Sequence, residues 1–370
     1  MSADTPAAGT QPGAARGTEP PAPQRPAPEQ RFLAACRRRP TDRTPVWFMR
    51  QAGRIFPEYR ALRERYDFLT LCRTPDLITQ VTLMPLEPLG VDAAIIFADI
   101  MLPLEALGIA YDLREGTGPV IQQPVRTAAD VARLARRDPR EANAYLYEGI
   151  RQVKRELGGR LPLIGFAGAP FTLACYLVEG RSSREFTRAR ALMHGDPAAW
   201  HALMDVLSDT ILDYLRAQVE AGVDAVQLFD SWVGGLSPWD YEEFVMPYSA
   251  RILQGLAGTG VPRIHFGTGT ATLLPLMARA GADVVGVDWR IGLDEAWDRI
   301  GPGYAVQGNL DPAVLLGPWE AVERRARDVL RRVGGRPGHI FNLGHGVLPG
   351  TPVDHLRRLV ELVHSTTAAG

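Results

Sequence analysis

The chain has 370 residues, of which 46% are hydrophobic and 22% charged, and its formal net charge is -1. This composition is ordinary for a soluble globular protein, and so small a net charge excludes the strong field that draws a protein to nucleic acid or to a membrane surface. The three cysteines are too few for a disulfide framework and favour a reducing cytoplasm, and no apolar run approaches the ~20 residues needed to span a bilayer.

Residues 1–30 are rich in Pro, Ala and Gly and contain no Val, Ile, Leu or aromatic residue. They also lack the apolar stretch of a signal peptide. Because such a segment cannot bury apolar surface, we predict a disordered tail over 1–30 and a folded domain over 31–370.

Short apolar runs recur along the folded part, and helical patterns follow them, as in 213–222 and 323–335. The runs are continuous rather than alternating, as in buried parallel strands. Eight such runs predict a single (β/α)8 barrel, because the competing doubly wound sheet usually has fewer strands. Residues 109–125 surround a Gly-rich turn and predict a β-hairpin insertion. The eight runs cover 44–49, 92–99, 161–168, 224–231, 263–269, 283–289, 304–310 and 339–346.

Polar residues stand at the ends of these runs. The active site of a barrel forms at the carboxyl ends of its strands, so these residues are candidates without any knowledge of motifs. They are Arg50, Asp99, the loop 168–170, Ser231, the loop 267–269, Asp288, Asn309 and His345.

Two long segments, PVWFMRQAGRIFPEYR (45–60) and GFAGAPFTLACYLVEG (165–180), resemble the two signatures of the uroporphyrinogen decarboxylase family. The segments 95–108, 228–238 and 342–352 resemble other parts of that family in the same order, so the resemblance covers the chain from residue 32 onward. It implies a (β/α)8 barrel that acts as a cytoplasmic homodimer without cofactor or metal. It also implies removal of carbon dioxide from the four acetate side chains of uroporphyrinogen III, which gives coproporphyrinogen III in haem biosynthesis.

The resemblance also implies the site residues. It assigns catalysis to Asp99, Arg50, Tyr176 and His345. The pair Ile55-Phe56 departs from the family pattern, where a Tyr-Leu or similar pair is expected, although both residues remain apolar. The implied substrate-binding residues are Arg50, Gln51, Ala52, Gly53, Arg54, Asp99, Tyr176, Ser231 and His345.

The chemistry of such a substrate needs these residue types. The macrocycle carries eight carboxylates, which planar arginine forks such as Arg50 and Arg54 match, and four pyrrole N–H groups, which the Asp99 carboxylate can accept. A fixed negative charge at Asp99 would also stabilise a pyrrole ring that becomes cationic as carbon dioxide leaves. The identity of the proton donor stays open between Arg50, acting as a relay, and the partners Tyr176 and His345.

Structural explanations for the same residues also stay open. An arginine pair can form a salt-bridge cluster, an aspartate at a strand end often caps a helix, and a histidine between glycines can bind a carbonyl. The segment GTGTAT, 267–272, fits a tight barrel loop better than a phosphate-binding loop. We expect Asp288 and Asn309 to hold loops or neighbouring strands.

Two other functional classes compete. Corrinoid or thiol methyltransferases share this barrel but hold zinc with His and Cys at strand ends, and here neither His265 nor His345 has a nearby cysteine. A non-catalytic tetrapyrrole carrier would need the same binding residues but no turnover. A Schiff-base enzyme is disfavoured because the single lysine, Lys154, falls on the polar face of a predicted helix.

Overall fold

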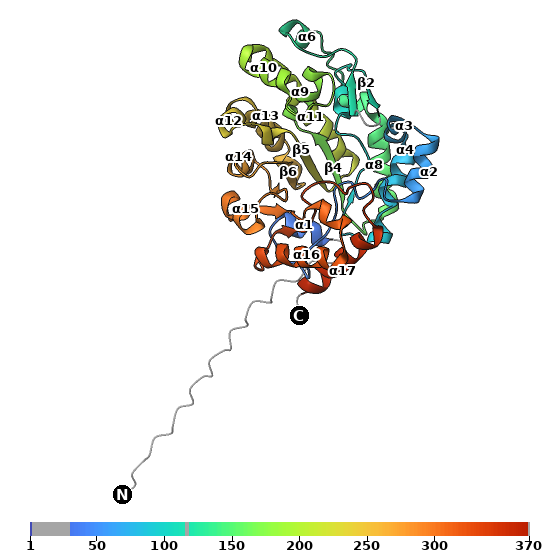
Figure 1. The fold of residues 1–370 in the computed structure, drawn as a ribbon, viewed down its shortest axis with the longest axis vertical. Helices are drawn as coiled ribbons and strands as arrows, with labels where there is room; N and C mark the ends of the chain where they lie inside the picture. Colours follow the sequence, from blue (N-terminus) through green and yellow to red (C-terminus); the bar gives the residue numbers. More distant parts are fainter. Residues whose placement is uncertain (2–29, 115–117, 369–370) are drawn as a thin grey trace.

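A parallel seven-stranded sheet, in the order β1-β4-β5-β6-β7-β8-β9, lies at the centre of the computed structural model, with helices around it (Figure 1). The structure describes residue 1 and residues 30–114 and 118–368, so the predicted tail lies almost wholly outside the described residues. The strands of this sheet are β1 (Ala94–Ile95), β4 (Leu163–Gly168), β5 (Ala225–Asp230), β6 (Arg263–Gly267), β7 (Val284–Gly286), β8 (Ala305–Gln307) and β9 (His339–Ile340).

Residues 45–47 fill the eighth position and close the barrel. Val46 forms an isolated parallel bridge with Phe341, and the amide of Phe341 donates to the carbonyl oxygen of Pro45 at 2.9 Å. On the other side, the amide of Asp92 donates to the carbonyl oxygen of Val46 at 2.8 Å. The predicted barrel is therefore confirmed, although the first of the eight runs forms a single bridge rather than a strand, because the chain turns away just after Trp47.

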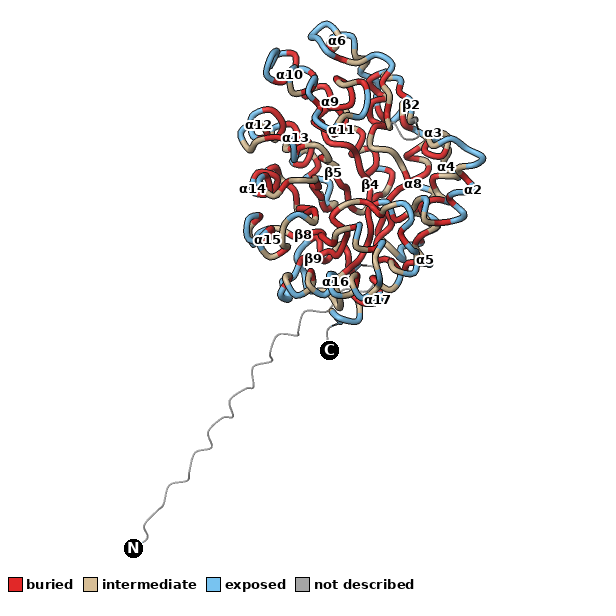
Figure 2. The backbone as a smooth tube through the Cα atoms, in the orientation of Figure 1, coloured by how far each residue is buried: buried red, intermediate tan, exposed pale blue. Residues whose placement is uncertain are grey.

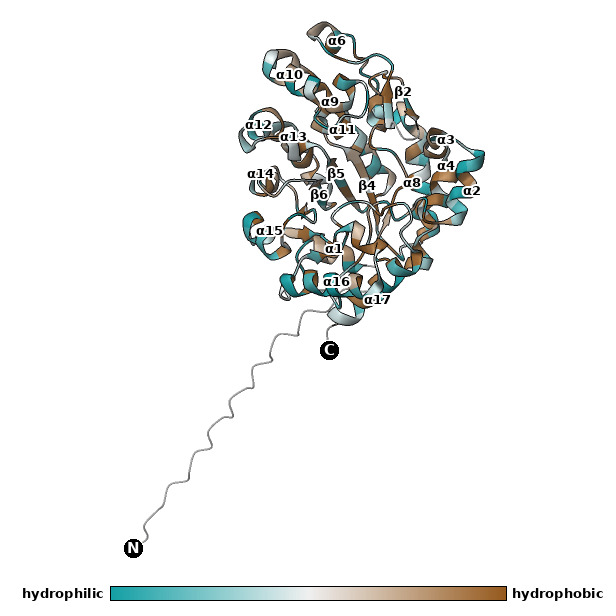
Figure 3. Cartoon of the chain, viewed as in Figure 1, coloured by the Kyte–Doolittle hydropathy of each residue, from teal (hydrophilic) through white to brown (hydrophobic). Residues whose placement is uncertain are grey.

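The helices surround this sheet and turn their apolar faces toward it. Figure 2 shows the strands mostly buried and the outer turns of the helices exposed, and Figure 3 shows the same division as hydropathy. The helices are α1 (Arg31–Cys36), α2 (Pro57–Arg65), α3 (Phe68–Arg73), α4 (Pro75–Leu83), α5 (Leu86–Leu89), α6 (Ala128–Ala132), α7 (Pro139–Ala142), α8 (Ala144–Leu157), α9 (Pro170–Glu179), α10 (Thr187–Gly195), α11 (Pro197–Ala221), α12 (Pro238–Phe244), α13 (Met246–Gly255), α14 (Leu274–Arg279), α15 (Leu293–Ile300), α16 (Trp319–Val333) and α17 (Val353–Thr367).

Both helices named from the sequence are present, as α11 and α16, and local signals explain their ends. The Asp196 side chain accepts from the amide of Ala199 at 3.0 Å and so caps the start of α11. Gly334, at φ 63, ends α16 in the left-handed conformation that glycine tolerates best. No helix in the described part of the chain is long and apolar enough to cross a membrane.

The predicted hairpin is also present. Strands β2 (Tyr111–Arg114) and β3 (Gly118–Ile121) pair antiparallel, and the amide of Ile121 donates to the carbonyl oxygen of Gly180 at 2.8 Å. This bond ties the hairpin to the end of α9, at the face of the barrel where the parallel strands end. The hairpin therefore adds a wall to that face.

Candidate active site

A cavity of about 560 Å³ opens at the carboxyl-terminal end of the barrel. Eight of the nine predicted substrate-binding residues line it, from five separate parts of the chain. Most of the remaining lining is apolar and rich in aromatic rings, which suits a large flat ligand. The eight are Arg50, Ala52, Gly53, Arg54, Asp99, Tyr176, Ser231 and His345, and the aromatic residues are Tyr59, Phe68, Phe97, Phe166, Phe229 and Phe266.

Asp99 presents an under-coordinated carboxylate to this cavity. Its Oδ1 accepts from the amide of Met101 at 2.8 Å, and among the described residues no donor reaches its Oδ2. Burial raises the pKa of Asp99 to about 6, against the opposing effects of the Met101 amide and the Arg50 charge. The helix-capping role considered from the sequence is not met, because the 3-10 helix Leu102–Glu105 that follows has Met101 at its N-cap position and no side-chain cap. The carboxylate therefore retains capacity to accept hydrogen bonds from a ligand.

The backbone and the packing around Arg50 fix the position of its guanidinium group at the cavity. Arg50 lies in the left-handed region at φ 60, which a non-glycine residue adopts only where its surroundings impose it. Gly346 packs against its side chain, since a Cβ added there would lie 2.5 Å from Cδ of Arg50. The side chain of the ninth predicted residue, Gln51, points away from the cavity.

Gln51 is fully buried and does not line the cavity. Its Oε1 accepts from the amide of Phe48 at 3.1 Å, and its Nε2 donates to the carbonyl oxygen of Ala93 at 3.1 Å. The side chain therefore joins the Arg50 loop to β1, whose run continues to Asp99. A direct role of Gln51 in substrate binding stays a prediction.

Two further predicted residues are electrically neutral at neutral pH. Burial, together with the charges of Arg50 and Arg290, lowers the pKa of His345 to about 4. Burial raises the pKa of Tyr176 to about 12. An imidazole and a phenol in these states act as neutral hydrogen-bonding groups rather than as a cation and an anion.

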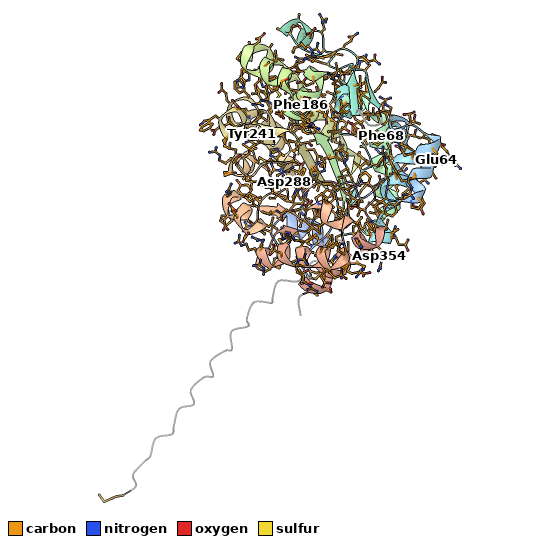
Figure 4. All side chains as sticks on the ribbon, viewed as in Figure 1. Glu64, Phe68, Phe186, Tyr241, Asp288 and Asp354 are labelled. Atoms are coloured by element: carbon orange, nitrogen blue, oxygen red, sulfur yellow. The ribbon has the colours of Figure 1, made fainter. Side chains whose placement is uncertain are left out.

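The loops around Ser231 are fixed by hydrogen bonds from their neighbours. The Thr268 hydroxyl donates to the carbonyl oxygen of Ser231 at 2.6 Å, and the amide of Gly269 donates to Oδ2 of Asp288 at 2.6 Å. Asn309 donates through Nδ2 to the carbonyl oxygens of Asp288 and Ile291, at 2.9 and 2.8 Å. The expectation that Asp288 and Asn309 hold loops is confirmed. Figure 4 shows Asp288 well inside the molecule, whereas Glu64 lies at its edge.

Comparison with known proteins agrees with this geometry. A model of the uroporphyrinogen decarboxylase family matches residues 27–366. The chain belongs to this family. It is 56% identical to the uroporphyrinogen decarboxylase of Roseiflexus sp. over 343 residues, covering 91% of this chain and 99% of that protein. It is also 56% identical to that of Sorangium cellulosum, with 92% and 97% covered.

A solved structure supports the fold as well. A methyltransferase from Methanosarcina mazei superposes with a TM-score of 0.72 at 20% identity, and the match covers 92% of this chain and 98% of that protein. Identity this low supports the shared barrel and carries no argument about activity.

Residues that the family signatures did not supply complete this decarboxylase-family cavity. Arg63 lines the cavity and lies four residues after Tyr59 on α2. Residues four apart share one face of a helix, so this spacing from a signature residue could have predicted Arg63. Ile55 lines the cavity and Phe56 is buried, so the pair that departs from the family pattern fills apolar positions. Pro119 of the hairpin adds a wall that only the folded chain places there.

Of the residues relevant to the competing classes, His345 lines the cavity, whereas His265 and Lys154 do not. Among the described residues, no three His, Cys, Asp or Glu side chains are grouped so as to hold a metal ion. His265 is fully buried and faces Asp230, with 3.4 Å between Nε2 and Oδ2. Lys154 pairs with Asp224 at 2.6 Å, just before β5 begins and therefore at the opposite end of the barrel from the cavity.

Proposed function

We propose that this protein is a cofactor-independent uroporphyrinogen decarboxylase. It converts uroporphyrinogen III to coproporphyrinogen III and four molecules of carbon dioxide, a step of haem biosynthesis. The observation that carries the proposal is the Asp99 carboxylate, which among the described residues accepts from the amide of Met101 alone and lies in a large, aromatic-walled cavity lined by arginines.

Binding follows from complementary charges. The four pyrrole N–H groups of the macrocycle converge on Asp99 and supply the donors that the protein leaves out. Each such bond to a charged acceptor contributes about 1.5–3 kcal/mol, which offsets the cost of a buried carboxylate. Arg50, Arg54 and Arg63 line the cavity and present planar forks to the carboxylates on the periphery of the ring.

The reaction uses the pyrrole as its own electron sink. Protonation of a ring carbon makes the pyrrole cationic. The bond between the acetate methylene and its carboxylate then breaks, and the electron pair flows into the ring as carbon dioxide leaves. Protonation of the resulting methylene and return of the ring proton give a methyl group. Asp99 stabilises the cationic ring, and Arg50 orients the departing carboxylate.

Tyr176 and His345 serve as neutral partners in this scheme. Since their pKa values keep both uncharged at neutral pH, each can donate or accept a hydrogen bond without adding charge. Ser231 contacts a substrate carboxylate through its hydroxyl. We further propose a cytoplasmic homodimer that needs no metal, nucleic acid or membrane partner.

Anaerobic incubation of the purified protein with uroporphyrinogen tests the proposal. A chelator is present and no methyl donor is added. Formation of coproporphyrinogen supports a metal-independent decarboxylase. Tight binding without product would instead indicate a carrier, and activity that requires a methyl donor or added zinc would indicate methyl transfer.

A further inference from the structure

A second cavity of about 250 Å³ lies beside the first at the same end of the barrel. Ser231 lines both cavities, so the two adjoin at this residue. The lining comes from the start of α9, from the segment before and within α10, and from the loops after β5, β6 and β7. Its charged members are Arg184, Glu185, Arg190 and Arg290.

An aromatic partition separates the two cavities. Tyr176 lines the first cavity, and Phe186 and Trp232 line the second. The ring centroids lie 5.9 Å apart for Tyr176 and Phe186, and 4.9 Å apart for Phe186 and Trp232. Phe186 is buried in a left-handed conformation at φ 46, so its position is imposed by this packing. The second cavity is thus walled by packed side chains on its inner side.

The charge of the second cavity is positive, with three arginines against one glutamate. Arg290 is held in place by an ion pair with Asp288 and by the ring of Trp289, 4.1 Å from its guanidinium carbon. Its charge also reaches the first cavity, where it contributes to the lowered pKa of His345. Within the described ranges, Arg184 and Arg190 form no ion pair.

The substrate has more carboxylates than the first cavity has arginines. The macrocycle carries eight carboxylates, and three arginines line the first cavity, Arg50, Arg54 and Arg63. We propose that the second cavity is a carboxylate subsite of the macrocycle, in which one substrate arm passes Ser231 and ends among Arg184, Arg190 and Arg290. This inference rests on the proposed function for the identity of the ligand.

The test uses binding, so that it does not depend on turnover. The double variant Arg184→Gln, Arg190→Gln removes two side chains that are exposed or half-exposed, so folding is not at risk. The control is the double variant Arg65→Gln, Arg188→Gln, which also removes two positive charges, from exposed positions of α2 and α10 that line neither cavity. Anaerobic equilibrium dialysis measures the dissociation constant for uroporphyrinogen and for coproporphyrinogen.

We expect the double variant to raise the dissociation constant for uroporphyrinogen about tenfold, as the loss of two partly exposed ion pairs implies, and the control to stay within about twofold. An equal weakening for both ligands would place a carboxylate that survives the reaction in the subsite, and weakening for uroporphyrinogen alone would place an acetate arm there. Unchanged binding, or an equal change in the control, would overturn the subsite. A protein that binds the macrocycle with this dependence but never decarboxylates it would refute the proposed function alone.

Discussion

Two aspartates on one run of the barrel have opposite surroundings. Asp92 stands just before β1 at the amino-terminal end, and Asp99 stands seven residues later at the carboxyl-terminal end. Asp92 is 4% exposed, and three groups donate to it: Nη1 of Arg31 at 2.5 Å, the amide of Val46 at 2.7 Å and Nε2 of His364 at 2.7 Å. Asp99 has the amide of Met101 alone among the described residues.

This contrast separates a structural carboxylate from a functional one. The donors of Asp92 come from α1, from the run that closes the barrel and from α17, so the charge joins distant parts of the chain. Protein groups satisfy the buried Asp92, whereas Asp99 lines the cavity with one protein donor and so has capacity left for donors of a ligand. The following experiments test whether the two carboxylates differ in this way.

The largest expected effect is on stability. Asp92→Ala leaves the guanidinium of Arg31, which is 2% exposed, without one of its two carboxylates. We expect the free energy of unfolding in urea to fall by about 3–5 kcal/mol, as when one partner of a buried ion pair is removed. Asp42→Ala removes the other, 33% exposed partner of Arg31 and should cost clearly less. Equal losses in the two variants would contradict the role given to Asp92.

The second experiment concerns charge at Asp99. Asp99→Asn keeps the size but turns an amide toward the pyrrole N–H groups, so we expect kcat to fall by about 100- to 1000-fold. Asp99→Glu keeps the charge and should retain more turnover. Single-turnover decarboxylation and equilibrium binding of the product measure the two roles separately. If Asn and Glu variants turn over equally, charge at residue 99 does not lower the barrier.

The third experiment concerns the shape of the cation. Arg50→Lys and Arg54→Lys keep the charge but lose the planar fork that binds a carboxylate through two hydrogen bonds. Loss of one such charge-assisted bond predicts a fall in kcat/KM of about tenfold or more for each variant. Arg65→Lys, on the exposed part of α2, is the matched control and should behave as the parent protein. Parent-like kinetics in both cavity variants would show that neither arginine depends on its planar fork to bind a substrate carboxylate.

The fourth experiment asks what Gln51 does. Gln51→Leu leaves the amide of Phe48 and the carbonyl of Ala93 without partners, at about 1–3 kcal/mol for each buried group. If Gln51 positions the Arg50 loop, the ligand-free protein loses stability and kcat/KM falls several-fold. A residue that only binds substrate would leave the unfolding free energy of the empty protein unchanged, and that result would restore the binding role implied by the family signature.

Gln51 also marks the limit of what the sequence could predict. Apolar runs predicted the barrel, and their polar ends placed Arg50, Asp99, Ser231 and His345 on one cavity, because strand ends of a barrel meet at one face. The resemblance to the family added the other four lining residues, Ala52, Gly53, Arg54 and Tyr176. The signature gave the identity of Gln51 but not its direction, since that depends on the left-handed turn at Arg50. The second cavity was not predictable, because loops distant in sequence bring Arg184, Arg190 and Arg290 together only after packing.

The smallest expected effect is a pH dependence of opposite sign for activity and stability. Burial raises the pKa of Asp99 to about 6 in the empty protein, from 3.8 as the ordinary value. The folded protein therefore binds more protons at this group than the unfolded chain does between these pH values. We expect kcat/KM to fall up to about tenfold per pH unit below pH 6, as the charged form is lost.

The stabilising effect of protonating Asp99 is fully present below pH 3.8 and is lost as the pH rises through 6. His345 works against it, because a histidine whose pKa is lowered to about 4 by burial destabilises the fold as the pH falls below its ordinary value of 6.5. The measurement is therefore the difference in unfolding free energy between the parent and Asp99→Asn, in which the histidine contribution cancels. That difference should favour the parent increasingly from pH 7 to pH 4. Bound pyrrole N–H groups favour the charged carboxylate, so the break in kcat should lie at lower pH than the break in kcat/KM. A difference in unfolding free energy that does not change with pH would show that burial does not penalise the charge of Asp99, and its contrast with Asp92 would then rest on hydrogen-bond count alone.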